Sequence, residues 1–200
     1  NRSQLIASGM SYDELHFEKI FSHCVLRYGI KEAYAKVLYP MLVRIGLMWA
    51  GDTIPPAQEH FISNSIRQKL FTAIDSLPPP KSSSGSWLLF LPENEFHEIG
   101  LLLANYIIRS SGRKVIYLGS DVPFQSLIGA VADTVSQNLL LFLVHRDLPE
   151  EVEGYLNKLN TTFTNKKIYV AGDPGLSRLK TQKKINLILS IEGLEQILSV

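Results

Sequence analysis

The residues best suited to chemistry lie in one segment, Pro92 to Pro123, which reads PENEFHEIGLLLANYIIRSSGRKVIYLGSDVP. His97 stands there in the pattern Glu-x-His-x-x-Gly, together with Glu95 and Gly100. An imidazole is a good ligand for a transition metal when its second nitrogen donates to a carboxylate, which fixes the tautomer and the basicity of the ring. Glu95 is the candidate for that carboxylate. Gly100, one turn into the following helix, would let a bulky planar ligand approach the backbone.

A strand and a helix are expected to position His97. The apolar run WLLFLP ends at Pro92, an amphipathic helix is predicted at 97–111, and a second strand, KVIYLG, follows Gly112. In open parallel sheets, ligands bind at the carboxyl ends of the strands. The pattern therefore places His97 at a ligand-binding edge. Without further information, His97 could instead be an ordinary surface residue or a helix cap rather than a metal ligand.

A second candidate group lies upstream, in MWAGDTIPPAQEHFISNSIRQKL. Trp49 is followed, ten and eleven residues later, by Glu59 and His60, close to the beginning of a long predicted helix. Taken singly, Trp49 also fits a core aromatic residue, and Glu59 and His60 also fit a solvated helix face.

Taken together, the two motifs resemble a known family. The motif around His97, with the following YLGSDVP, resembles the cobalamin-binding signature in which a histidine displaces the nucleotide base and ligates cobalt from below. The Trp-x9-Glu-His motif that begins at Trp49 is similar to the helical cap over the upper cobalamin face in MerR-type transcriptional regulators of the CarH/LitR photoreceptor type. The resemblance implies His97 as the metal ligand and a cofactor site made of Trp49, Glu59, His60, Glu95, His97, Gly100 and Gly172.

The resemblance also implies a function. The chain would be the sensory part of such a regulator, binding adenosylcobalamin, responding to light, and assembling as a dimer or tetramer. Promoter DNA would be bound by a helix-turn-helix domain that precedes this chain, which begins at Asn1 rather than Met. No Ser-His-Asp set, P-loop, CxxC or HExxH motif points to independent catalysis, so we do not expect an enzyme.

Three positions depart from the family pattern. Ala50 stands where the family has a second histidine, after the cap tryptophan, that can ligate cobalt after photolysis. Leu143 is aligned with a serine beside the nucleotide tail, and Ala171-Gly172-Asp173 replaces a Gly-Gly pair. Two alternatives therefore stay open: a regulator that has lost the cofactor and responds to another ligand or to a protein, and a corrinoid protein that carries methyl groups.

Composition limits the remaining classes. The chain has 200 residues, 46% of them hydrophobic, and a net charge of +1, so no global basic field indicates binding of nucleic acid or anionic membranes. The single cysteine, Cys24, excludes an internal disulfide and fits a reducing cytoplasm. No apolar run approaches the roughly 18 residues of a membrane span.

The pattern of periodicity predicts an α + α/β architecture. A four-helix bundle over residues 1–77 should include a helix that opens at the capping-box sequence Ser11 to Glu14 and ends at Gly29, followed by a helix that Pro40 kinks or splits. Residues 78–86, PPPKSSSGS, read as a linker. Residues 87–200 are expected to form a Rossmann-like (flavodoxin-like), five-stranded parallel domain, with strands near 87–91, 114–118, 139–144, 167–171 and 185–190.

Overall fold

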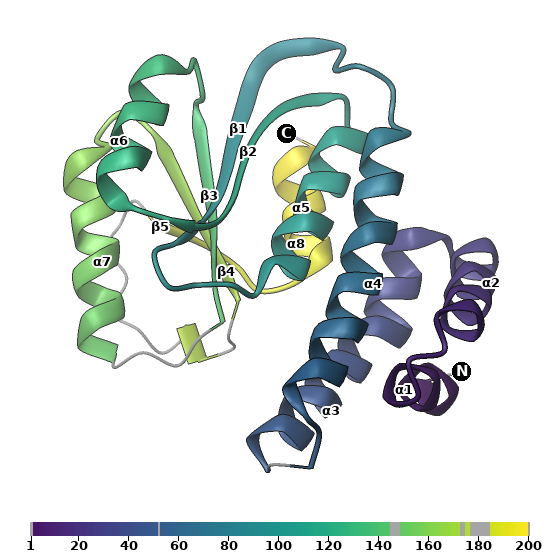
Figure 1. The fold of residues 1–200 in the computed structure, drawn as a ribbon. Coiled ribbons are helices and arrows are strands. Elements are labelled where there is room, and N and C mark those ends of the chain that lie inside the picture. The colour runs from purple at the N-terminus through teal and green to yellow at the C-terminus, as the bar shows by residue number, and fades with distance from the viewer. Residues whose placement is uncertain (1, 52, 145–148, 173–174, 177–184, 200) are drawn as a thin grey trace. The chain divides into compact units, whose positions relative to one another are not determined.

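The chain divides into two compact units, Asn1–Thr72 and Ala73–Val200 (Figure 1). The computed structural model describes residues 2–51, 53–144, 149–172, 175–176 and 185–199. Within these ranges, no helix combines the length and the apolar character that a membrane crossing requires.

Unit 1 is helical. Its elements are α1 (Arg2–Met10), α2 (Glu14–Ala33), the π-helical turn η1 (Tyr34–Leu38), α3 (Tyr39–Ala50) and α4 (Pro56–Asp75), the last of which continues past the unit boundary. Each long helix contributes one apolar face to the interior. The buried side chains of these faces include Phe17, Phe21, Leu38, Met41, Ile45, Ile62, Ile66 and Leu70.

The interruptions of the helices follow from particular residues. Gly29 has a φ of 73° and a ψ of 164°, so α2 is kinked where the sequence predicts its end. Just before Pro40, the N–H of Tyr39 donates to the carbonyl of Tyr34, five residues earlier. This wide π turn is consistent with the distortion expected from a proline, whose ring clashes with the preceding helical turn. The N-cap of α2 differs from the predicted capping box, because Asp13 rather than Ser11 accepts from the N–H of His16.

Unit 2 is a parallel sheet covered on both faces. The strands are β1 (Ser82–Pro92), β2 (Arg113–Val122), β3 (Asn138–Leu143), β4 (Lys167–Gly172) and β5 (Ile185–Ile188), in the order β2-β1-β3-β4-β5. Helices α5 (Glu98–Ser110) and α8 (Ile191–Leu198) lie on one face, and α6 (Phe124–Asp133) and α7 (Pro149–Thr162) on the other (Figure 1). This strand order is that of flavodoxin-like sheets, so the predicted fold class is confirmed.

The two faces of β3 carry different side chains. Leu139, Leu141 and Leu143 belong to the core under α6 and α7, which also contains Val152 and Leu156 of α7. Since side chains alternate along a strand, the residues between them face α5 and α8.

The predicted linker is partly wrong, because β1 already begins at Ser82. Ser82 is in register with Arg113 of β2, and the N–H of Lys81 donates to the carbonyl of Gly112 over 3.0 Å. Small polar residues are typical of linkers, so the sequence did not predict a strand here. Backbone pairing with a neighbouring strand, however, does not require apolar side chains.

Substituting Gly172→Ala should destabilise the protein strongly. Gly172 has a φ of 137°, and an added Cβ would lie 2.0 Å from the carbonyl oxygen of Leu143. Backbone strain and steric overlap together should cost about 2–5 kcal/mol in the free energy of unfolding, measured by urea denaturation. The matched control is Gly154→Ala in α7, where nothing lies within 4 Å of the added Cβ. That variant should gain about 0.5–1 kcal/mol, and equal stabilities for the two variants would contradict this account.

Candidate functional site

His97 lies at the carboxyl edge of the parallel sheet, in the short loop that joins β1 to α5. It is the N-cap residue of α5, with a φ of −78° and a ψ of 66°. The loop is a tight turn in which the N–H of Glu95 donates to the carbonyl of Pro92 over 3.0 Å and Asn94 takes a positive φ of 66°. The structure therefore places His97 at the edge where the sequence predicts it.

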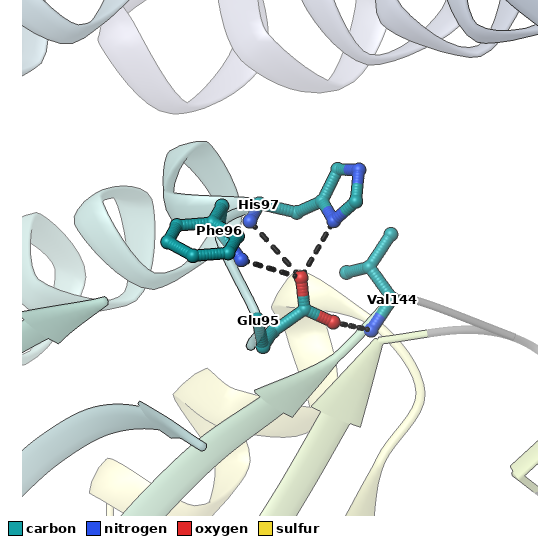
Figure 2. Close-up of polar contacts among 4 residues, drawn as sticks. All are labelled: Glu95, Phe96, His97 and Val144. Carbon is teal, nitrogen blue, oxygen red and sulfur yellow. Dashed lines mark hydrogen bonds and ion pairs between the residues drawn. The ribbon is translucent and has the colours of Figure 1, made fainter. Parts of the chain in front are cut away.

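The carboxylate of Glu95 organises this loop (Figure 2). Its Oε1 accepts from Nδ1 of His97 at 2.6 Å, from the backbone N–H of His97 at 3.0 Å and from the N–H of Phe96 at 2.9 Å. Its Oε2 accepts from the N–H of Val144 at 2.9 Å. Glu95 is only 4% exposed, so these charge-assisted bonds stabilise a buried anion and tie the His97 loop to the end of β3.

The contact with Glu95 fixes the chemistry of the imidazole. With Nδ1–H donating to the carboxylate, Nε2 carries the lone pair and is the nitrogen suited to bind a metal. The His97 side chain is 57% exposed, so a ligand can reach it. Among the described residues there is no group of three or more His, Cys, Asp or Glu side chains that could hold a bare metal ion. This donor set, one imidazole backed by a carboxylate, fits a metal whose other ligands belong to a macrocycle.

The end of β2 braces the same loop through contacts that the motif did not reveal. The N–H of Asn94 donates to the carboxylate of Asp121, and the N–H of Asp121 donates to the carbonyl of Glu95 at 3.2 Å. The hydroxyl of Tyr117 donates to Glu98 at 2.8 Å. Tyr117 and Asp121 both belong to the YLGSDVP stretch, so the sequence indicated this segment but not which residues it contacts.

Gly100 has a different neighbour from the one expected. An added Cβ there would lie 2.6 Å from the ring of Phe142, so this glycine accommodates an aromatic side chain of the protein itself. Leu143, which the sequence aligned with the tail-binding position, belongs to the core under α6 and α7. Alternation along β3 places Phe142, rather than Leu143, on the Gly100 side. Ala171 is in register with Phe142, whereas Asp173 lies outside the described residues.

The upstream motif belongs to unit 1. Trp49 and Ala50 lie at the carboxyl end of α3, and Glu59 and His60 lie near the beginning of α4. Nδ1 of His60 lies 2.8 Å from a carboxylate oxygen of Glu59, and the His60 side chain is 70% exposed. This is a second imidazole–carboxylate pair, of the same kind as the pair in unit 2.

Comparisons with known proteins agree with the resemblance to cobalamin-binding regulators. Residues 2–73 match the family described as "B12 binding domain". The chain is 30% identical over 158 residues to the HTH-type transcriptional repressor CarH of Myxococcus xanthus, covering 79% of this chain and 52% of that protein. It is 32% identical over 126 residues to the repressor CarA of the same organism, covering 62% of this chain and 42% of that protein. The chain thus spans about half the length of these curated relatives.

A solved structure supports the fold. The monomethylamine corrinoid protein of Methanosarcina barkeri superimposes with a TM-score of 0.74 at 15% identity, covering 98% of this chain and 95% of that one. The fold is therefore the Rossmann-like fold of corrinoid proteins, preceded by a helical region. The helical region, residues 2–73, is similar to a B12-binding domain. More particularly, it is homologous to the repressors CarH and CarA, which confirms the resemblance drawn from its two motifs.

Substituting Glu95→Ala should destabilise unit 2 and release the His97 ring. Two backbone N–H groups of the loop and that of Val144 lose their acceptor, which should cost at least about 3 kcal/mol in urea denaturation. In nitrogen-15 spectra, His97 should lose its preference for the Nδ1–H tautomer. The control is Glu93→Ala, an exposed carboxylate in the same loop. The assigned role of Glu95 is wrong if both variants keep wild-type stability and the His97 tautomer.

Proposed function

We propose that this chain is the cobalamin-binding sensory part of a light-responsive transcriptional regulator, with adenosylcobalamin as the bound form. The observation that carries the proposal is the Glu95–His97 pair, a single oriented imidazole at the carboxyl edge of the sheet. The B12-binding domain in unit 1 and the homology to two repressors support it independently.

Each residue of the site has a distinct role in this proposal. His97 ligates cobalt through Nε2, and Glu95 holds the ring and its tautomer. Gly100 and Gly172 are assigned to the edge next to the ligand, where neither residue adds a side chain of its own. When bound, adenosylcobalamin supplies a light-labile cobalt–carbon bond.

Unit 1 would serve as the sensor of the upper ligand. Trp49, Glu59 and His60 are assigned to the contact with the deoxyadenosyl group. A group that is present in one state and absent in the other provides the differential contact that any switch requires. In the regulator, the change would be passed to a helix-turn-helix domain outside this chain, through formation or loss of dimers or tetramers that pair two such domains on promoter DNA.

A corrinoid carrier of methyl groups is the second candidate function, because the fold matches a corrinoid protein over nearly the whole chain. The regulator is favoured, since both curated relatives are repressors. In both proposals the chain binds a cofactor, and we assign no catalytic residue to it.

Substituting His97→Ala should remove the lower ligand. Titration with adenosylcobalamin, followed by absorption in the dark, should show a spectrum shifted toward the base-ligated or water-ligated form, and an affinity reduced at least tenfold, or about 1.4 kcal/mol. The matched control is His23→Ala, an exposed histidine on α2, which should behave as the wild type. An unchanged spectrum and affinity in His97→Ala would refute the assignment.

Assembly should depend on cofactor and light. If loss of the upper ligand moves unit 1, the mass measured by light scattering should differ between the dark adenosylcobalamin complex and the same sample after illumination. The cofactor-free chain serves as the reference. An identical mass in all three states would exclude control through oligomerisation and favour the carrier function.

A further inference from the structure

Phe142 packs against Gly100 in the helix that follows His97. Gly100 lies three residues after His97, in the first turn of α5. A Cβ built on Gly100 would lie 2.6 Å and 2.8 Å from two carbons of the Phe142 ring. The ring therefore rests on the helix backbone at the one position of this turn that has no side chain.

The neighbouring positions at the ends of β3 and β4 are also filled. Ala171 is in register with Phe142 and is 4% exposed. Gly172 is in register with Leu143 and approaches its backbone so closely that no side chain fits between them. Leu143 itself is 7% exposed within the core of the opposite face. The Phe142 ring thus occupies the position next to Gly100 on the sheet side of this turn.

This packing has a consequence for any corrinoid that carries a nucleotide. A histidine that ligates cobalt from below takes the place of the tethered base, which then needs space of its own past the imidazole. The side chains on the sheet side of that turn, Phe142 and Ala171, are apolar and offer no hydroxyl to the nitrogen of a base.

Building on the proposed function, we infer that Phe142 is a specificity-determining residue: it weakens the binding of cobalamin, which carries the lower nucleotide, relative to a corrinoid that lacks this nucleotide. A nucleotide-bearing corrinoid binds only when the Phe142 ring turns away from Gly100 or when the base stays outside the protein, and both reduce its affinity. A corrinoid without the nucleotide requires neither a movement of the Phe142 ring nor a base left outside the protein, so its affinity is not reduced.

The test compares two probes, aquocobinamide, which has no nucleotide, and hydroxocobalamin, which has one. Absorption titrations of the wild-type chain should show tighter binding of aquocobinamide by at least tenfold, or about 1.4 kcal/mol. Displacing the base from cobalt costs free energy in any protein. The decisive measurement is therefore how the ratio of the two affinities, aquocobinamide to hydroxocobalamin, changes in Phe142→Ala. Hydroxocobalamin affinity should rise at least tenfold in that variant, while aquocobinamide affinity stays within about twofold.

Two further variants keep the result interpretable. Phe124→Ala removes a half-buried phenylalanine on the opposite face of the sheet, so it reproduces the loss of an aromatic side chain without opening the Gly100 side. It should leave the ratio of affinities unchanged. Should Phe142→Ala fail to fold, Phe142→Leu provides the smaller side chain in a more conservative form, and it should shift the ratio in the same direction.

The outcomes separate this inference from the proposed function. Equal affinity for the two probes in the wild type, or a ratio that neither Phe142 variant changes, overturns the inference and leaves cobalamin binding intact. Failure of both probes to bind to the wild type overturns the proposed function and the inference with it.

Discussion

The buried carboxylate of Glu95 is the interaction on which the rest of the site depends. A buried charge is stable only when hydrogen-bond donors surround it, and here the donors come from His97, Phe96 and Val144. Those contacts hold the loop after β1 against the end of β3. They also orient the imidazole, so a single side chain serves both the stability of the edge and the chemistry of the site.

The sheet topology makes this arrangement possible. β1 pairs with β2 on one side and with β3 on the other, so the loop that follows β1 can be tied to both neighbouring strand ends. Asp121 at the end of β2 and Val144 after β3 supply those ties. This edge of the doubly wound sheet is thus held by backbone N–H groups and two carboxylates, those of Glu95 and Asp121.

The sequence predicted the local features of this molecule better than its non-local ones. The Glu95–His97 contact spans two residues, and the apolar runs of the strands are visible directly, so both could be found from the pattern. The roles of Phe142 and Leu143 could not, because a shift of one residue along a strand exchanges its two faces. The beginning of β1 at Ser82 was missed for a related reason, since its pairing with Arg113 joins distant parts of the chain.

The central claim is that His97, held by Glu95, is the lower ligand of cobalt. Electron paramagnetic resonance of the cobalt(II) form tests it most directly, with protein labelled by nitrogen-15 and cofactor of natural abundance. If His97 ligates the metal, the nitrogen splitting should change from a triplet to a doublet on labelling, and this doublet should be absent from labelled His97→Ala. A triplet that labelling leaves unchanged would show that the cofactor's own base remains bound, and would contradict the account.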